Sequence, residues 1–362
     1  MNDHARAREP DHRGRRARLG RLRADGLAFS HPDTRLVAAF DAARERAITP
    51  VRDQGTGTKP RVVEFEEDAL TAFSALVIGA REQARTRITA LAAERTGPVT
   101  AWLIGRYFAF TGDPEAAAWL HPSLQALQLG SSLATAALSD SRPHQDPLLP
   151  LVARELIPLA EATGDASVTT TARRLAAGAD PGRSVDAVLS RLADVRSAEG
   201  WRRPLDVLNA LLDGRTEIAA QGWQEIATDT ADEERSWIVP LLVAGMLGID
   251  PDAERGRLRL RPHAPADWPH WGADNIRVGD TAVELSVERE GDTIAIRVDQ
   301  TAGALPLTLI LEPTVEAPVG PCFVDGQPAD LAVRPGPHRV VVPVQLVLDS
   351  PRELRITLDS QA

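Results

Sequence analysis

The sequence predicts a multidomain α + β protein in which an array of helical hairpins is followed by an antiparallel β-sandwich. Up to Ile249 the apolar residues recur at helical spacing, whereas beyond Asp250 they alternate with polar residues, as in half-buried strands. The change falls within one stretch, because the almost wholly apolar run 236–249 is followed by alternating Arg and Leu over 257–261. The length of 362 residues also favours two domains over one.

We expect three parts along the chain: a disordered basic N-terminal arm over residues 1–30, a helical domain over 31–249 and a C-terminal β-sandwich domain over 250–362. The first 25 residues contain eight arginines and few large apolar groups, a composition that cannot bury enough surface to fold. No aromatic residues lie among these arginines. A solvated tail is therefore favoured over a nucleic-acid contact.

Apolar spacing and helix breakers predict about ten helices joined by short turns. Short connections place neighbouring helices antiparallel, as in helical hairpins. Residues 110–116 and 162–168 share a pattern in which Gly ends one helix and Asp caps the next, which fits a repeated hairpin. The expected helices are 36–48 with Asp33 as its cap, 66–80, 81–95, 100–110, 115–129, 148–162, 167–177, 184–197, 205–212 and 234–249. Asp250-Pro251 is expected to end the last one, because a residue before proline is pushed out of the helical region.

Beyond residue 250 the chain shows short alternating runs separated by turn residues. Gly279, Gly291 and Gly326 each lie beside an Asp between two runs, a pair that is typical of hairpin turns. The expected strands are 257–261, 275–278, 282–287, 294–298, 305–311, 339–344 and 353–358. Strands at this spacing with no helix between them indicate an antiparallel sandwich.

Composition narrows the class of protein. The net charge of −10 argues against general nucleic-acid affinity, and no apolar run reaches the roughly 20 residues that a membrane-spanning helix needs. One cysteine, Cys322, permits no intrachain disulfide and no cysteine metal cluster, which is consistent with a reducing cytoplasm. The eight histidines are scattered without the spacing of a zinc helix. We therefore expect a cytoplasmic protein with no metal, no cofactor, no nucleic-acid partner and no membrane partner, while the oligomeric state stays open.

The stretch from Trp237 to Ala253, followed by 256–269, resembles the junction in bacterial six-hairpin glycosidases. In this superfamily, which includes glucoamylase-like and trehalase-like enzymes, a closing helix of an (α/α) toroid leads into a C-terminal β-domain. Thinner similarity extends upstream to the run from Gly105 to Asp113. The resemblance implies a helical-hairpin (α/α) toroid, minimal or incomplete, followed by the sandwich. It also implies carbohydrate metabolism as the field of activity.

The resemblance points to one group of site residues. In the glucoamylase-like branch an inner helix opens with an aromatic residue and Gly-Arg-Asp, and its Arg and Asp hold sugar hydroxyls. At the matching place this chain has Phe65-Glu66-Glu67-Asp68, which keeps the aromatic residue and the Asp but lacks the Gly and the Arg. The segment between Gln128 and Gln145, where such enzymes carry long loops, is short.

Glycosidic hydrolysis requires two carboxyl groups facing one cavity. Two acidic clusters, one around Asp68 and one around Glu225, lie far apart in sequence. A toroid would bring both clusters to the same open end of its cavity. Asp68 and Glu225 are therefore the candidate catalytic residues. The candidate substrate-binding residues are Phe65, Glu67, Trp223 and Trp237, the two tryptophans as platforms for sugar stacking. The alternative interpretation is structural, since acidic residues stabilise helix starts and tryptophans fill cores.

Two functions follow from these observations. The first is glycoside hydrolysis by two carboxylates, with a saccharide or glycoside as substrate. The second is a catalytically inactive relative that binds a saccharide or a protein partner through the cavity that holds the active site in the enzymes. The sequence favours the second slightly, because the Arg beside Asp68 is missing and the loops that would bear the second carboxylate are short.

Overall fold

The computed structural model describes most of the chain outside the N-terminal segment. Its described residues are 26–49, 62–95, 97–125, 148–177, 187–190, 192, 202–229, 237–316, 318–336 and 338–359. The expected arm over residues 1–25, the segment between Gln128 and Gln145 and most of the expected helix 184–197 lie outside them. Within the described residues, no helix is long and apolar enough to cross a membrane.

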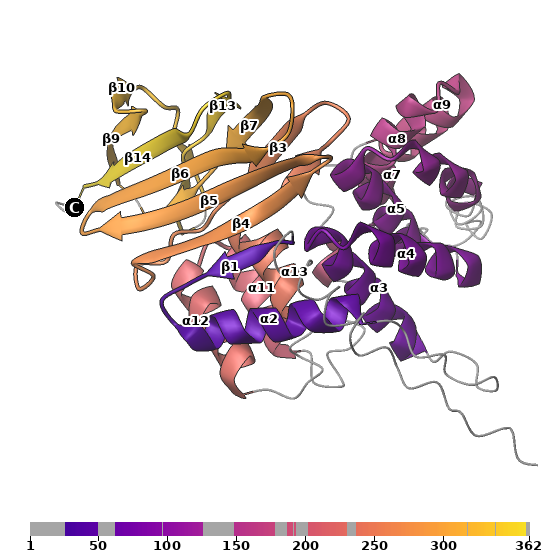
Figure 1. The fold of residues 1–362 in the computed structure, drawn as a ribbon, viewed down its shortest axis with the longest axis horizontal. Helices are drawn as coiled ribbons and strands as arrows, with labels where there is room; N and C mark the ends of the chain where they lie inside the picture. The colour runs from indigo at the N-terminus through magenta and orange to yellow at the C-terminus, as the bar shows by residue number, and fades with distance from the viewer. Residues whose placement is uncertain are drawn as a thin grey trace, which may run out of the picture.

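Helices form the first two thirds of the fold and lie beneath and beside the sheets (Figure 1). Helix α2 packs between α3 and α12, and α3 packs against α4 and α5, so neighbours along the chain are neighbours in space. The helices are α2 (Thr34–Ile48), α3 (Val62–Val77), α4 (Arg81–Glu94), α5 (Pro98–Thr111), η1 (Pro114–Ala116) with its continuation over 117–125, α7 (Leu148–Glu155), α8 (Ile157–Ala162), α9 (Ala166–Leu175), α11 (Arg202–Leu212), α12 (Thr216–Asp229), α13 (Ile238–Pro240) and η4 (Leu241–Met246).

The predicted signals at Asp33 and at the two Gly-Asp repeats are confirmed. Asp33 caps α2 by accepting a hydrogen bond from the Arg35 backbone N–H at 2.9 Å. At both repeats of the Gly-Asp pattern the glycine has a left-handed backbone, φ +66° at Gly112 and +69° at Gly164, where residues with a Cβ are strained. The following Asp113 and Asp165 cap the next helical turn through their side chains.

Two helices differ from the prediction. Helix α12 was not predicted, because its run contains Gly222, a poor helix former. A Cβ at that position would lie 2.6 Å from Val207 Cγ2, so the glycine allows α11 and α12 to pack closely. The expected helix 148–162 is broken after Glu155, since Pro158 cannot donate a hydrogen bond to the preceding turn.

The last apolar helix, α13 with η4, is buried among other helices. Leu242 is fully buried, and the helix packs against α2, α3, α11 and α12. It ends earlier than expected: Gly248, with φ +57°, turns the chain before Asp250-Pro251 is reached. The sandwich meets the end of this helix, where the N–H groups of Arg261 and His263 donate to the carbonyls of Leu247 and Met246. The helix is therefore mainly a core element of the helical array.

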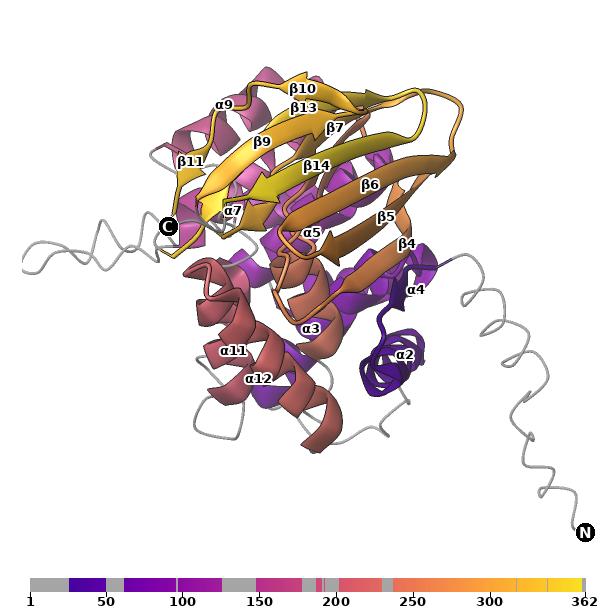
Figure 2. The ribbon, with the colours of Figure 1, turned by 90° about the vertical axis from the view of Figure 1, so that its left-hand side faces the viewer.

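The C-terminal part is a β-sandwich. A seven-stranded sheet has the order β1-β4-β5-β6-β14-β9-β10, a four-stranded sheet the order β13-β7-β3-β2, and a three-stranded sheet the order β11-β12-β8 (Figures 1 and 2). The strands are β1 (Ala28–Ser30), β2 (Asp250–Asp252), β3 (Arg257–Leu260), β4 (His270–Val278), β5 (Thr281–Glu290), β6 (Thr293–Ala302), β7 (Leu307–Leu311), β8 (Thr314–Val315), β9 (Val319–Val324), β10 (Gln327–Ala329), β11 (Arg334–Pro335), β12 (Val340–Val341), β13 (Val344–Leu348) and β14 (Arg352–Leu358).

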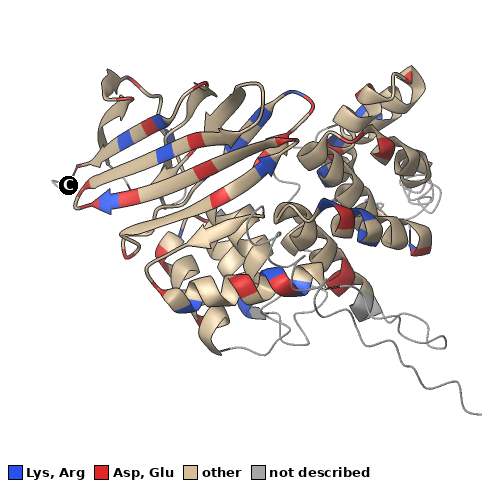
Figure 3. Ribbon diagram, in the orientation of Figure 1, with Lys and Arg blue, Asp and Glu red and all other residues tan. Residues whose placement is uncertain are grey.

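The predicted hairpins β4–β5 and β5–β6 and the predicted turn at Asp325-Gly326 are confirmed, with φ above +50° at Gly279, Gly291 and Gly326. The strands β9 and β10, which pair on either side of that third turn, were not predicted. The prediction of a wholly antiparallel sandwich needs one correction, because β3 and β7 pair in parallel. Charged residues of both signs are interspersed along the strands of the large sheet (Figure 3), and Glu284, Glu288 and Arg297 are exposed to solvent. The inner positions, such as Val283, Leu285 and Val287 of β5, are buried.

The N-terminal strand departs from the expected arm. Residues 28–30, which we expected within the disordered arm, form β1 and pair antiparallel with β4. Phe29 explains this, because its buried ring contacts Trp223 of α12 and Trp268 of the sandwich at centroid distances of 5.2 and 6.5 Å. This aromatic cluster joins the sheet to the helices beneath it.

Candidate functional site

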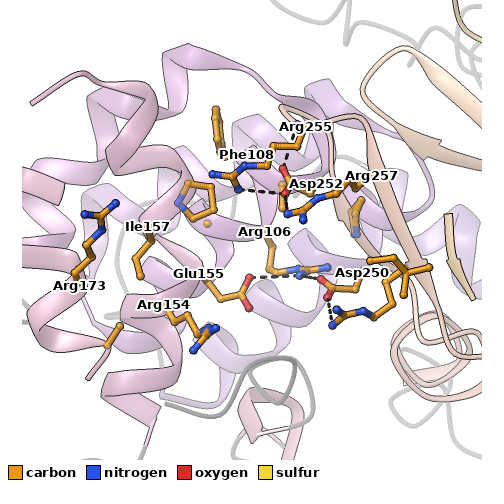
Figure 4. A pocket seen from close by; sticks show the side chains of 17 residues that line it. Arg106, Phe108, Arg154, Glu155, Ile157, Arg173, Asp250, Asp252, Arg255 and Arg257 are labelled. Atoms are coloured by element: carbon orange, nitrogen blue, oxygen red, sulfur yellow. Dashed lines mark hydrogen bonds and ion pairs between the residues drawn. The ribbon is translucent and has the colours of Figure 1, made fainter. Parts of the chain in front are cut away.

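A cavity of about 470 Å³ lies where the helical array meets the first strands of the sandwich. Its wall comes from α5 and the segment from α7 to α9 on one side, and from β2, β3 and β7 on the other. This volume is in the range of small-molecule sites. Figure 4 shows that charged side chains dominate the lining. They are the arginines Arg106, Arg154, Arg173, Arg255, Arg257 and Arg259 and the carboxylates Glu155, Asp250 and Asp252.

Arg106 of α5 is the centre of this arrangement. Its side chain is 1% exposed, and its Nη1 donates to Asp250 Oδ1 at 2.7 Å and to Glu155 Oε2 at 3.3 Å (Figure 4). Its Nη2 donates to the Ile249 carbonyl at 3.4 Å. One buried guanidinium therefore ties α5 to the end of α7 and to the first strand of the sandwich.

Gly105 allows Arg106 to reach Glu155. A Cβ at position 105 would lie 2.9 Å from the backbone oxygen of Glu155 and 3.0 Å from its Cβ, closer than real Cβ contacts. The absence of a side chain thus lets α5 approach the last turn of α7. The contact between Arg106 and Glu155 in the cavity wall therefore requires a glycine at position 105.

The β2–β3 hairpin supplies the opposite wall. Asp252 accepts hydrogen bonds from Arg255 at 3.2 Å and from Arg257. Arg255 also reaches Glu161 of α8 at 2.8 Å, and Glu161 in turn accepts from Arg173 of α9 at 2.8 Å. Each of these two carboxylates is shared by two guanidinium groups, so the hairpin is bound to the helical array by ion pairs.

Neighbouring guanidinium groups keep Asp250 and Glu161 charged. Burial favours the neutral form of Asp250, but the charge and hydrogen bond of Arg106 outweigh this effect and hold the pKa of Asp250 below its usual value. The hydrogen bond from Arg173 is the main cause that lowers the pKa of Glu161. Burial opposes the charged form of Arg106, yet Glu155 and Asp250 raise its pKa. Arg106 and Asp250 therefore face each other as permanent ions at neutral pH.

The predicted catalytic residues do not line this cavity. Asp68 lies in the second turn of α3, with a side chain that is 47% exposed and an ion pair to Arg87 at 3.8 Å. Glu225 lies in the middle of α12, where its exposed side chain accepts a hydrogen bond from Gln221 at 3.3 Å. Glu225 thus lies within a helix that continues to Asp229, in a stretch for which no helix was predicted.

The predicted substrate-binding residues have mostly packing contacts. The Arg95 guanidinium lies 4.7 Å from the centroid of the half-buried Phe65 ring, and Glu67, two residues further along α3, is half-buried. Trp223 is 1% exposed and Trp237 is fully buried. Both indoles belong to the core, so they lie where no sugar ring can stack on them without opening the packing.

Glu66 is the inward-facing member of the predicted acidic cluster on α3. It is 6% exposed, and its Oε2 has no hydrogen-bond partner among the described residues. Glu64 has no described side chain, and Asp232, Glu233 and Glu234 of the second cluster lie outside the described residues.

Sequence reasoning missed the cavity residues Arg106, Glu155 and Asp250 as a group. Arg106 and Asp250 are 144 positions apart, and only the packing of α5 against β2 brings them together. The available signals were the Gly105-Arg106 pair inside an apolar helix and the density of arginines around β3. A charged residue on an otherwise apolar helix is buried only when it is paired.

Comparison with known proteins identifies the fold. No family model matches the chain, and no curated protein matches it. Among solved structures, an α-L-rhamnosidase from Dictyoglumus thermophilum is 10% identical with a TM-score of 0.55, over 92% of this chain and 50% of that one. A protein described as a kojibiose phosphorylase from the human microbiome is 7% identical over 92% and 68% of the two chains, with a TM-score of 0.45.

The chain thus has a fold similar to that of this α-L-rhamnosidase, with helical and sandwich parts in the same order as expected from the sequence. It spans about half the length of the rhamnosidase. At 10% identity the likeness establishes the fold and leaves the activity to be argued from the residues.

Proposed function

We propose that this protein is a saccharide-binding relative of the six-hairpin glycosidases that uses the cavity between α5, α7 and the β2–β3 hairpin without hydrolysing its ligand. The fold supports a carbohydrate ligand, and the cavity of about 470 Å³ offers guanidinium donors and carboxylate acceptors for sugar hydroxyls. Phe108 and Ile157 add apolar wall between these charges (Figure 4).

The observation that carries the proposal is the sharing of Arg106 by Glu155 and Asp250. The two carboxylate oxygens contact the same nitrogen at 3.3 and 2.7 Å, so they lie within about 6 Å of each other. Carboxyl groups about 5 to 5.5 Å apart serve retaining glycosidases, but there they flank the scissile bond. Here a buried guanidinium occupies the space between them. Both groups bind Arg106, and Asp250, with its lowered pKa, is a poor proton donor.

Glycoside hydrolysis by Asp68 and Glu225 is the second candidate function. The burial of Glu66 beside Asp68, with one carboxylate oxygen unpartnered among the described residues, supports it. A buried carboxyl group of this kind is a common feature of catalytic acids. In this alternative the acid and base come from α3 and α12, and the Arg106 cavity is structural.

A panel of aryl glycosides and disaccharides, assayed for turnover and by thermal shift, separates the two functions. We expect a rise in melting temperature with at least one saccharide and no turnover by the wild type. The matched variants are Asp68→Asn, Glu66→Gln and Glu225→Gln, which preserve shape and remove charge. Turnover that falls by 10² or more in any of them would establish hydrolysis and refute the proposal, since a positioned acid or base contributes about 10² to 10⁴ in rate.

A further inference from the structure

The arginines of the cavity outnumber its carboxylates. Six arginines and three carboxylates line it, and adding Glu161 and Glu312, which pair with these arginines from outside the lining, still leaves one positive charge in excess. The whole chain, in contrast, carries a net charge of −10. The cavity is thus a local concentration of positive charge on an acidic protein.

The carboxylates around the cavity are already engaged. Asp252 accepts from Arg255 and Arg257, Glu161 accepts from Arg173 and Arg255, and Asp250 and Glu155 accept from Arg106. Arg106 and Arg255 thus each pair with two carboxylates, whereas Arg257 pairs with one that it shares with Arg255.

Arg259 is the exception. It lies on β3 in the cavity lining, with a side chain that is 31% exposed. Its Nη1 is 3.8 Å from Asp250 Oδ2 and its Nε is 3.7 Å from Glu312 Oε2, both beyond hydrogen-bond distance. Within the part of the chain that the structure describes, Arg259 makes no hydrogen bond. Its guanidinium has five donors and keeps its charge throughout the physiological range.

Arg257 stands beside it on the same face of the strand. Residues two apart on a strand project to the same side, roughly 6.6 Å from each other. Arg257 contributes a second guanidinium, whose charge Asp252 neutralises only in part because Asp252 also forms an ion pair with Arg255. An anionic group beside Arg259 would therefore meet an unfilled donor set inside a positive cavity.

We propose that the ligand of this cavity is a saccharide that carries an anionic group, a carboxylate or a phosphate, and that Arg259 binds this group. The inference rests on the proposed saccharide-binding function and names its ligand class. Guanidinium groups match both carboxylate and phosphate through paired N–H donors, and the partly desolvated wall strengthens such bonds. A neutral sugar would leave Arg259 with only its two long ion pairs, to Asp250 at 3.8 Å and to Glu312 at 3.7 Å.

Isothermal titration with matched pairs of probes tests this assignment. The pairs are D-glucuronate with D-glucose, D-galacturonate with D-galactose, and glucose 6-phosphate with inorganic phosphate. We expect at least tenfold tighter binding of one acidic sugar than of its neutral partner. Whichever acidic probe binds best, uronate or sugar phosphate, identifies the anionic group. Its advantage should shrink when NaCl is raised from 50 to 300 mM.

Arg259→Gln should weaken binding of the acidic sugar tenfold or more and leave the neutral sugar unchanged. Arg355→Gln is the control, because Arg355 is an exposed arginine that pairs with Glu353 on β14 of the seven-stranded sheet, whereas β3 belongs to the four-stranded sheet. Should Arg259→Gln fail to fold, the salt dependence of acidic-sugar binding by the wild type tests whether an ionic contact holds the ligand. Equal affinity for acidic and neutral sugars would overturn this inference and leave the proposed function standing. Inorganic phosphate that binds as well as the sugar phosphate would overturn the saccharide ligand, and no binding of any sugar would overturn both proposals.

Discussion

Replacing Arg106 by Met tests whether the guanidinium between Glu155 and Asp250 holds the two parts of the fold together. Met retains an unbranched apolar stem and removes the charge and the donors. Arg106 is 1% exposed, whereas the side chains of Glu155 and Asp250 are 18% and 33% exposed. Breaking a buried pair by removing one partner costs about 3 to 5 kcal/mol. Water reaches Asp250 in part, so we expect a loss of about 3 kcal/mol, the lower end of that range.

The assay is urea-induced unfolding at pH 7, followed by circular dichroism, for the wild type, Arg106→Met, Asp250→Asn and the double variant. The double variant should lose less than the sum of the single variants, because the residues share one interaction. Arg355→Met, which removes an exposed ion pair, should cost less than about 1 kcal/mol. A loss below about 1 kcal/mol for Arg106→Met would refute the central role of this residue.

The pH dependence of the same variant follows from the lowered pKa of Asp250. In the unfolded chain this carboxyl has its ordinary pKa of about 3.9, so the ionised form stabilises the fold above that pH. The stability is lost as the pH falls through the lowered folded value. The difference between wild type and Arg106→Met should therefore be full at pH 6 and shrink below about pH 4. A difference that is constant down to pH 2 would contradict the ion-pair account.

Three further predictions concern the packing. Leu242→Asp should abolish soluble expression, because Leu242 is fully buried and a carboxylate there has no partner; a soluble variant with unchanged melting would contradict this placement. Gly105→Ala should lower the melting temperature, since its Cβ would meet the Glu155 backbone at 2.9 Å, whereas Gly97→Ala, with no atom within 4 Å of its Cβ, is the control for calorimetry. Burial, helped by Arg339 and Arg261, lowers the pKa of His263 to about 4, so only the unfolded chain takes up this proton between about pH 6.5 and 4. The wild type should lose roughly 3 kcal/mol across that window as the pH falls, and His263→Gln should give a flatter unfolding profile.

Local signals in the sequence predicted the elements that local chemistry controls. Asp33 caps its helix and Gly112 ends another because each effect depends on the adjacent turn alone. The hairpin at Gly291 follows from two neighbouring alternating strands in the same way. The order of a helical array and a sandwich could be predicted because the apolar period changes from helix to strand near residue 250.

Tertiary contacts explain what the sequence did not predict. Gly222 lowers the helical propensity of α12, but the close approach of Val207 requires it. The parallel pairing of β3 with β7 joins residues about fifty positions apart. The cavity depends on the same kind of contact, because Arg106 is recognisable as a binding residue only once Asp250 lies beside it. The choice of Asp68 and Glu225 as catalytic residues stays a prediction, which the glycoside panel tests.

The division into a helical domain and a sandwich domain also stays a prediction. Ion pairs cross between the two parts at Arg106 and Asp250, at Arg255 and Glu161, and at Arg339 and Glu217. The aromatic contact of Phe29 with Trp223 adds an apolar link. We expect the two parts to unfold together in one transition, because these buried links would be broken if either part unfolded alone.

Hydrogen–deuterium exchange with a glucuronate-containing disaccharide tests the location of the binding site most directly. We expect slower exchange in the peptides that cover the cavity wall when the disaccharide is present at saturation. These peptides contain residues 105–109, 154–158 and 250–259. Peptides that cover Asp68 and Glu225 should exchange at the same rate with and without the disaccharide. Protection confined to the peptides around Asp68 and Glu225, with none at the cavity wall, would contradict a binding site at the Arg106 cavity. It would place the site on α3 and α12 of the helical array.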